Sequence, residues 1–275
     1  AAMAGHRSSS AIHLAEDYFY ETRPEEFFAR GGARVAVGRH RIEAGVEGAR
    51  TRYALDAYFS RLPAAGQGGY VFSGLTKLRA TEAVTGGRLA VHAADRWTIL
   101  PGTELEAGGR ADRYGLSGVT VLSPRLAGAQ SLGRRVKLLA SFGLYPQAPQ
   151  AAEVLPRWGN PELEPSRAWH AIGGFEWTRG SWTATVETYA KRFAALVVPD
   201  ARTVYANAGT GEARGVEVLL RRSFSERFAG WIAYGRASSR RRDGPGTAER
   251  PSDYDLPHAL SVVGRARPAP AWTLS

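Results

Sequence analysis

Alternation of apolar and polar residues is the feature that most constrains how this chain can fold. Residues 182–191 read WTATVETYAK, so one parity of this run is mostly apolar and the other is mostly polar. Successive side chains of a β-strand point to opposite faces, so this spacing indicates a strand. The same alternation recurs at 41–47, 103–112, 136–144 and 214–221. The sequence therefore predicts an all-β chain whose strands each have one apolar face and one polar face.

The connections between these runs alternate in length. Short turns are expected near residues 38, 101, 134, 180, 226 and 268, and long polar connections at 54–69, 113–121, 145–166, 193–212 and 237–256. Short turns at one end and long loops at the other are typical of outer-membrane barrels, in which the short turns are periplasmic and the long loops extracellular. A soluble sandwich does not usually separate its loops by length in this way.

The pattern thus predicts an incomplete, antiparallel, up-and-down transmembrane β-barrel of about 12–13 strands, each about ten residues long where it crosses the bilayer. Aromatic residues near the strand ends fit the girdles of such a barrel, although they would also close a soluble core. They are Tyr53, Trp97, Tyr114, Tyr145, Trp169, Trp177, Trp182, Tyr234 and Trp272. Asp95 shares the parity of Leu89, Val91 and Trp97, which requires either a bulge or a position at the membrane boundary.

Composition narrows the classes of protein that remain. Hydrophobic residues make up 44% of the 275 residues, which argues against disorder over the whole chain. No apolar run reaches the roughly 18 residues that a transmembrane helix needs. The first residues, AAMAGHRSSS, lack the pattern of a signal peptide, so an exported protein would carry its signal upstream. The absence of cysteine excludes disulfides, thiolate catalysis and cysteine-bound metals.

The chain is basic, with a net charge of +10, and nearly all of its cations are arginine. Nucleic-acid binding is the obvious interpretation of such a balance. The arginines are spread along the whole chain and are not clustered on one element, so no nucleic-acid partner is predicted. The densest group, 240–242, lies in SSRRRDGPG, which reads as a solvated loop.

Motifs of catalysis are missing from the sequence. It contains no Walker sequence, HExxH or GxSxG, and its six histidines lack metal-ligand spacing. Glu104 and Glu106 share one strand face, where two lumen carboxylates balanced by Arg110 are favoured over a general acid/base pair. The sequence therefore predicts no enzyme, no metal site and no cofactor.

Six segments, in order along the chain, resemble the β-barrel of TonB-dependent outer-membrane receptors. GNPELEPSRAWHAIGGFEW, for example, is similar to that family's "GNPdLkPE" loop and the strand after it. The segments are AVHAADRWTILPGTELEAGGRADRY (90–114), LSPRLAGAQSL (122–132), VKLLASFGLYPQAPQAAEV (136–154), GNPELEPSRAWHAIGGFEW (159–177), YANAGTGEARGVEVLLRR (205–222) and DYDLPHALSVVGRARPAPAWTLS (253–275).

The resemblance covers about residues 33–275 and implies a partial receptor barrel, with 1–275 as one domain. Such barrels close at about 22 strands, so the plug domain, the TonB-contacting box and the last strands are expected to lie outside this segment. The resemblance implies a transporter in the bacterial outer membrane, surrounded by lipid and lipopolysaccharide. It implies uptake of a scarce small molecule, such as a ferric siderophore or cobalamin, driven by the TonB complex through the missing plug.

Ligand contacts are expected in the outer loops, where arginine suits an anionic iron chelate. The residues selected are Trp158, Tyr205, Arg240, Arg241 and Arg242. The alternative is that the arginines contact lipopolysaccharide phosphate or water. Two other functions remain open, namely a porin or adhesin without energy coupling and a soluble β-sandwich binding module. An isolated open sheet is expected to aggregate or to depend on detergent.

Overall fold

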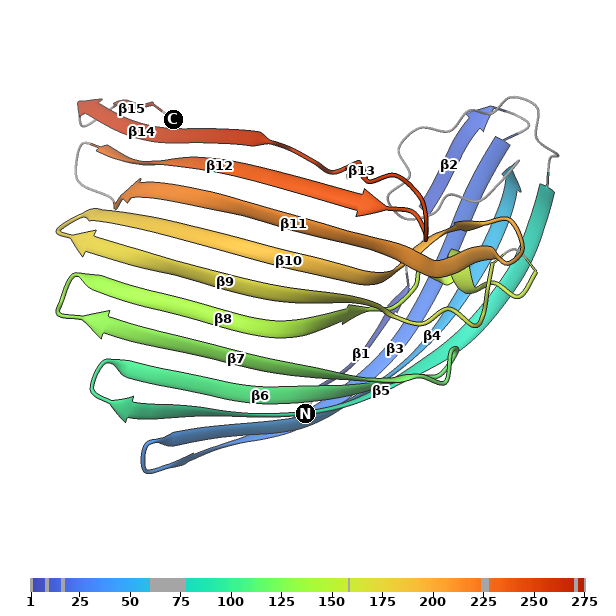
Figure 1. The fold of residues 1–275 in the computed structure, drawn as a ribbon, viewed down its shortest axis with the longest axis horizontal. Coiled ribbons are helices and arrows are strands. Elements are labelled where there is room, and N and C mark those ends of the chain that lie inside the picture. Colours follow the sequence, from blue (N-terminus) through green and yellow to red (C-terminus); the bar gives the residue numbers. More distant parts are fainter. Residues whose placement is uncertain are drawn as a thin grey trace.

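The strands of the protein form one antiparallel sheet (Figure 1). The computed structural model describes residues 2–7, 10–15, 18–59, 78–157, 159–223, 228–269 and 272–274. Its elements are β1 (Ala2–Arg7), β2 (Ser10–Ala15), β3 (Tyr18–Val37), β4 (His40–Phe59), β5 (Leu78–Leu100), β6 (Thr103–Tyr114), β7 (Thr120–Leu132), β8 (Val136–Gln147), the 3-10 helix η1 (Ala151–Val154), β9 (Ser166–Arg179), β10 (Trp182–Asp200), β11 (Val204–Arg222), β12 (Phe228–Arg242), β13 (Arg250–Pro251), β14 (His258–Ala269) and β15 (Trp272–Leu274). Among the described residues, no helix has both the length and the apolar character needed to span a membrane.

The sheet has an up-and-down topology. Its strands follow the order β1-β3-β4-β5-β6-β7-β8-β9-β10-β11-β12-β14-β15, so that neighbours in the sheet are also neighbours along the chain from β3 to β12. Within the described residues β1 and β15 do not pair with each other, so the sheet is open. The predicted incomplete antiparallel barrel is confirmed. The sheet contains 15 strands, more than predicted, because the short strands β2 and β13 pair beside the main path.

Short turns gather at one end of the sheet, at the left of Figure 1, and the long connections lie at the other end. Gly38 follows Val37 with a φ of 60°, and Gly180 follows Arg179 with the same φ. A two-residue hairpin needs a positive φ that glycine adopts without strain. The predicted short turns near 38, 101, 134 and 180 are confirmed. Residues 224–227 lie outside the described residues, and at 268 the strand β14 still continues, to Ala269.

One predicted connection is wrong. Residues 193–212 do not form a long loop, because β10 continues to Asp200 and β11 begins at Val204. Shifts of register around Leu196 allow the strand pair to continue through this irregular stretch. The connection at 113–121 is also shorter than predicted, since β6 ends at Tyr114 and β7 begins at Thr120. The long connections between β8 and β9 and between β12 and β14 are present.

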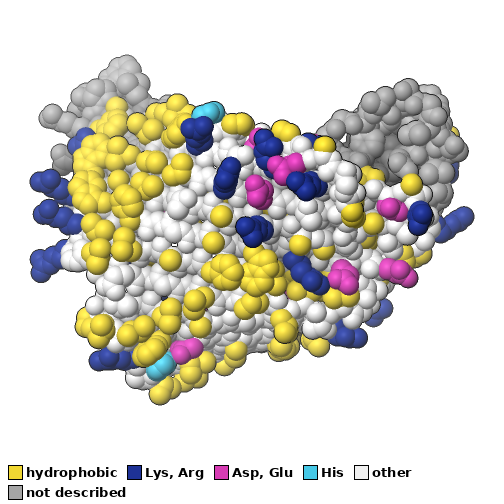
Figure 2. Space-filling view, viewed as in Figure 1, with side chains coloured by type: hydrophobic (Ala, Val, Ile, Leu, Met, Phe, Trp, Pro, Cys, Tyr) yellow, Lys and Arg dark blue, Asp and Glu magenta, His cyan; other side chains and the backbone are white. Residues whose placement is uncertain are grey.

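From β4 to β12 the apolar parity of the strands faces the same side of the sheet. Cross-strand pairs on this side include Val46 with Val91, Phe175 with Val186, and Val186 with Val218. The large apolar side chains here are exposed: Val91 by 51%, for example. Figure 2 shows this apolar face with no second layer over the described strands. A sandwich would bury such side chains, so the described part of the chain is not a sandwich.

Asp95 lies on the apolar face, and the pairing of β4 with β5 shows no bulge beside it. Its carboxylate lies 2.7 Å from Nδ1 of His40, within hydrogen-bond distance. The imidazole of His40 stacks on Trp97, with 5.5 Å between the ring centroids. His40 is the first residue after the turn that joins β3 to β4, so this polar cluster sits at the boundary of the apolar belt.

We predict that arginine in the middle of the apolar belt destabilises the folded barrel. Val218→Arg, in a receptor expressed from the complete reading frame, should lower the unfolding free energy in a bilayer by about 2–4 kcal/mol. The reason is that the guanidinium would have to lie in hydrocarbon. The matched control is Leu219→Arg, one residue along on the polar face of β11, with a smaller expected effect because its side chain lies in the aqueous lumen. Equal effects of the two substitutions, measured by denaturant unfolding in lipid vesicles, would contradict the assignment of faces.

Candidate functional site: the lumen wall and the inner loop

The connection between β8 and β9, residues 148–165, folds back over the polar face of the sheet and is called the inner loop here. Leu155 is fully buried and lies against β4, whereas Leu163 packs against β10 and β11. The two buried clusters are Leu55, Ala57 and Leu155, and Val154, Leu163, Val197 and Tyr205. Because β4 and β10 are far apart in the order of the sheet, the inner loop connects two separate parts of its wall. The polar face is therefore the concave, lumen side.

Two asparagines fix the inner loop to the wall. Nδ2 of Asn160 donates a hydrogen bond to the backbone oxygen of Tyr205 at 2.8 Å. Asn207 binds Glu164 twice, because its Nδ2 donates to the Glu164 carbonyl at 2.9 Å and its Oδ1 accepts the Glu164 N–H at 2.8 Å. Asn160 belongs to the segment GNPELEP and Asn207 to YANAG, so two of the segments that resemble the receptor family meet here.

Close backbone contact explains the glycine before Asn160. A Cβ atom at Gly159 would collide with the carbonyl oxygen of Glu153, so no larger residue fits without a shift of the backbone. That carbonyl accepts the N–H of Asn160 at 2.6 Å. The Glu153 side chain is buried and accepts the N–H of Gln150 at 2.7 Å, which closes the first turn of η1. The inner loop thus has a compact and defined backbone.

A cavity of about 380 Å³ lies between the inner loop and β3–β6. Its lining combines apolar groups of the loop with polar groups of the wall, and includes Glu26, Tyr53, Arg88, Tyr114, Val154 and Leu163. A concave, mostly apolar surface with a few polar groups is typical of small-molecule sites. This loop cavity lies toward the long connections, at the end predicted to be extracellular.

Ion pairs cover the lumen wall of β3–β6. Arg110 donates to Glu47 and to Asp112, both at 2.8 Å, and Asp112 is buried. Arg41 binds Glu104 at 2.9 Å, Arg96 binds Glu106 at 2.8 Å, and Arg34 binds Glu43 at 2.8 Å. Glu104 and Glu106 do face the lumen. The prediction that Arg110 balances Glu104 and Glu106 is wrong, because Arg110 binds Glu47 and Asp112, whereas Arg41 and Arg96 bind Glu104 and Glu106.

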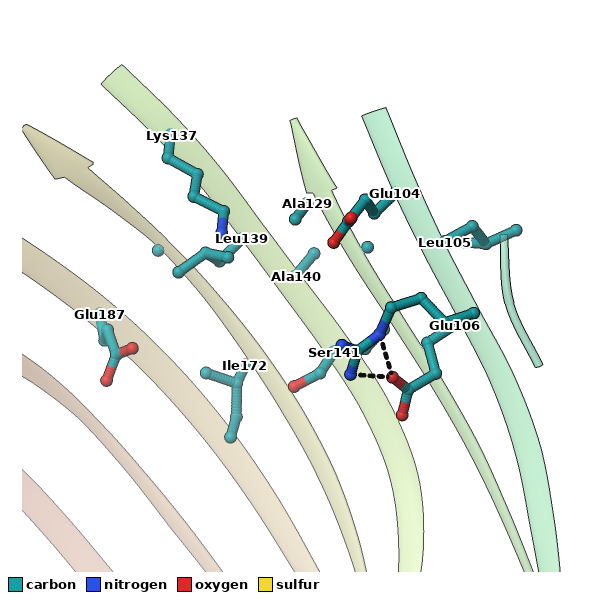
Figure 3. Close-up of a pocket in the computed structure, with 14 residues that line it drawn as sticks. Glu104, Leu105, Glu106, Ala129, Lys137, Leu139, Ala140, Ser141, Ile172 and Glu187 are labelled. Atoms are coloured by element: carbon teal, nitrogen blue, oxygen red, sulfur yellow. Dashed lines mark hydrogen bonds and ion pairs between the residues drawn. The ribbon is translucent and has the colours of Figure 1, made fainter. Parts of the chain in front are cut away.

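A second hollow, the lower groove, lies on the lumen wall near the short turns and has a volume of about 440 Å³. Figure 3 shows Glu104 and Glu106 from β6 and Lys137 from β8 projecting into it, with Glu187 of β10 at its far side. Dashed lines mark the ion pair between Glu106 and its arginine partner (Figure 3). This wall is charged and exposed, and it is suited to contact a polar partner inside the lumen.

The predicted ligand-contact residues do not converge on one cavity. Arg240 and Arg242 both pair with Glu249, at 3.1 and 3.5 Å, and Arg241 pairs with Asp243 at 2.7 Å. Tyr205 is 2% exposed beneath the inner loop. Trp158 lies outside the described residues. Contact of these residues with a ligand stays a prediction. The sequence interpretation missed Asn160 and Asn207, whose only signal was their place in the two family-like segments.

The loop after β12 is held by a shared carboxylate. Asp243 accepts hydrogen bonds from Nε of Arg241 at 2.7 Å and from Nε of Arg250 at 2.8 Å. Partial burial raises the pKa of Asp243, but the hydrogen bond of Arg250 and the charges of both arginines outweigh this effect. The pKa of this carboxyl therefore lies below its ordinary value. Among the described residues, no group of three acidic, histidine or cysteine side chains is arranged to hold a metal ion.

Comparison with known proteins identifies the fold. A family model described as "TonB dependent receptor-like, beta-barrel" matches residues 7–275. The chain belongs to the TonB-dependent receptor family. Proteins of this family lie in the outer membrane of Gram-negative bacteria and are receptors and transporters rather than enzymes.

Solved structures of such receptors share the fold of this TonB-dependent receptor barrel. The ferric enterobactin receptor PfeA of Pseudomonas aeruginosa is similar with a TM-score of 0.66 and 16% identity, over 92% of this chain and 47% of that chain. The siderophore receptor PirA of Pseudomonas aeruginosa has a TM-score of 0.67 and 15% identity, over 98% and 52%. The ferric-catecholate import receptor Fiu of E. coli K12 has a TM-score of 0.66 and 14% identity, over 98% and 47%.

This TonB-dependent receptor barrel therefore spans about half the length of the solved receptors that it resembles, between 47% and 52% in these three cases. At this level of identity the similarity establishes the fold and not the ligand. No curated protein matches the sequence.

We predict that Asn207→Ala releases the inner loop. The substitution removes both hydrogen bonds to the Glu164 backbone. At about 0.5–1.5 kcal/mol for each hydrogen bond, the loss of local stability should be about 1–3 kcal/mol. Limited proteolysis should then cut residues 148–165 at least several times faster than in the parent. The matched control is Glu162→Ala, which alters an exposed side chain of the same loop and should leave the cleavage rate unchanged. An Asn207→Ala protein as resistant as the parent would show that the asparagine clamp does not hold the loop.

Acid should release the loop at 243–257. Because the pKa of Asp243 is lowered by folding, its contribution is fully present above the ordinary aspartate pKa of about 3.9. It should be lost as the pH falls through the still lower pKa of the folded state. The rate of pepsin cleavage within 243–257 is measured for the parent and for Asp243→Asn between pH 2 and about pH 5. The quantity compared is the ratio of the two rates at each pH. The parent should resist cleavage at the upper end and approach the variant at the lower end; a constant ratio would rule out the Asp243 linkage.

Proposed function

We propose that this chain forms part of the barrel of a receptor that imports a scarce small molecule across the bacterial outer membrane. The preferred ligand class is a metal chelate such as a ferric siderophore, and cobalamin is the second candidate ligand. Energy would come from the TonB complex, acting through a plug domain seated against the lumen wall. The support for transport is membership of the family, together with solved receptors of the same fold for ferric enterobactin and other siderophores.

The single structural observation that carries the proposal is the loop cavity. It combines two tyrosines, Tyr53 and Tyr114, with Arg88 and with apolar groups of the inner loop. Aromatic rings and a guanidinium suit an anionic chelate with planar donor groups, because arginine stacks on such groups and binds their oxygens. The cavity lies on the lumen side, where a ligand entering from outside would pass. The exposed, charged lower groove beneath it suits the polar surface of a plug.

A porin or adhesin without energy coupling is the second candidate. It would have the same apolar face and the same arrangement of turns. The inner loop favours a receptor, because it is pinned across the lumen wall at both of its apolar clusters and would obstruct free diffusion.

Uptake of radiolabelled iron tests the proposal. The parent gene, with its complete reading frame, is expressed in an outer-membrane receptor-deficient strain and supplied with catecholate, hydroxamate or citrate iron chelates. Uptake of at least one chelate should depend on the gene and should stop in a strain that lacks TonB or when the proton gradient is dissipated. Uptake that continues without TonB would indicate a porin, and no uptake of any chelate or of cobalamin would reject the transport proposal.

The same assay separates the two groups of proposed ligand contacts. Arg88→Gln in the loop cavity should raise the half-saturating chelate concentration about tenfold, the effect of losing one charge-assisted hydrogen bond. Replacing 240–242 with serine tests the contacts predicted from sequence, and unchanged uptake rejects them. Surface labelling of intact cells checks that each variant reaches the membrane.

A further inference from the structure

Five lumen-facing side chains of the neighbouring strands β7–β10 form a continuous row, called the ladder here. The guanidinium carbon of Arg125 lies 4.6 Å from the ring centroid of Tyr145, and that ring stacks on His170 with 4.5 Å between the centroids. Nζ of Lys191 lies 4.9 Å from the ring centroid of Tyr189. His170 and Lys191 pair in register, which joins the two halves of the row. The ladder thus alternates cations with rings at the distances of cation–π and stacked contacts.

Two glycines make room for the ladder against the wall. Gly143 pairs in register with both Arg125 and His170. A Cβ atom at Gly143 would lie 3.1 Å from Cγ of Arg125 and 3.2 Å from Cε2 of Tyr145. A Cβ atom at Gly215 would lie 2.6 Å from the hydroxyl oxygen of Tyr189. The long side chains therefore lie over positions where the next strand has no side chain, which holds the ladder flat along the strands.

The two cations of the ladder differ from those on the wall of β3–β6, where Arg110 binds Glu47 at 2.8 Å. Within the described part of the chain, neither Arg125 nor Lys191 forms an ion pair with a carboxylate. Glu187 and Glu217 pair in register with each other, closer to the short turns than the ladder is. The ladder therefore carries positive charge that the wall itself does not neutralise.

The ladder lies between the two hollows of the lumen wall. Pro146, which follows Tyr145, lines the loop cavity. Ser141 and Ile172, which lie below the ladder on β8 and β9, line the lower groove (Figure 3). A molecule that moves from the loop cavity to the lower groove along β8 and β9 therefore crosses the ladder.

We propose that the ladder binds an anionic molecule that carries aromatic rings, and so selects such ligands over neutral, ring-free ones. The inference rests on the proposed uptake function and adds the chemistry of the ligand. Arg125 and Lys191 would bind its oxygens through charge-assisted hydrogen bonds, and the rings of the ladder would stack on its own rings. An acidic side chain elsewhere in the receptor would meet the two cations, but it would leave the three rings without a partner.

Calorimetric binding to the receptor, expressed from its complete reading frame and purified in detergent, tests this inference. The probes are three gallium(III) complexes: an anionic tris-catechol chelate, anionic gallium citrate without rings, and a neutral tris-hydroxamate chelate. The parent should bind the tris-catechol chelate most tightly. Arg125→Gln and Lys191→Gln should each weaken binding of both anionic probes about tenfold. Tyr145→Leu should weaken the tris-catechol chelate alone, at least about threefold, and Tyr145→Phe should bind it as the parent does.

The matched control is Arg221→Gln, which removes the same charge from the lumen face of β11 near the short turns. It should bind every probe as the parent does. Heat-modifiable migration in gels shows whether each variant is folded, and Arg125→Lys, expected to bind more tightly than Arg125→Gln, checks the charge independently. Equal affinity of the parent and the ladder variants for the tris-catechol chelate would overturn the site, as would a loss of the same size for the neutral chelate.

Uptake is read separately in cells. TonB-dependent uptake that is indifferent to the ladder variants would remove the ladder and leave the transport function standing. Binding of the anionic chelates without any uptake would do the reverse.

Discussion

The whole structure depends on pairing every backbone group along strands that have one apolar face. Hydrocarbon offers no hydrogen bonds, so a strand that meets lipid must be satisfied by its neighbours. The continuous registers from β3 to β12 meet this demand, while the alternation of side chains sends one parity to lipid and the other to the lumen. A shift by one residue would exchange these faces, so the apolar pattern also fixes the register. Irregular backbone is confined to places with other support. Examples are the stretch around Leu196 and the inner loop, where Asn207 serves both by donating to the carbonyls of Ala195 and Glu164.

The inner loop shows how a long connection gains a defined shape inside such a barrel. Its apolar residues cannot face lipid, and they pack in two places against the wall instead. Asn207 pairs with the backbone of Glu164 in the loop, and Asn160 of the loop donates to the carbonyl of Tyr205 in β11. Gly159 permits the close approach of two backbone segments that this shape needs. The segments 159–165 and 205–207 thus form one structural unit although β9 and β10 separate them in the chain. The loop cavity lies between this unit and β3–β6.

Period-two alternation and turn glycines predicted most of the fold, because both act locally and leave a direct mark on the sequence. Strand ends were predicted less well. The stretch 193–212 contains Pro199 and glycines that read as a loop, but pairing across a bulged ladder kept it extended. The site was harder still. Arg110 on β6 binds Glu47 on β4. This contact forms because both strands pair with β5, and the sequence alone does not show that arrangement. The place of Tyr205 beneath the loop likewise follows from long-range packing that one sequence does not reveal.

The two faces of the sheet differ in what balances their charged side chains. On the lumen wall of β3–β6, arginines form ion pairs with carboxylates on the next strand or the one after it. These charges therefore compensate one another within the wall. On the apolar face of the described strands, charge appears only at the two ends of the belt, where water and headgroups are within reach of a long side chain. Arg192, Arg214 and Arg236 occupy one such end, where Glu212 lies in register with Arg192 on the same face. A charged side chain is stable at this level of the barrel because its aliphatic part covers apolar surface while its charged end stays in the polar boundary.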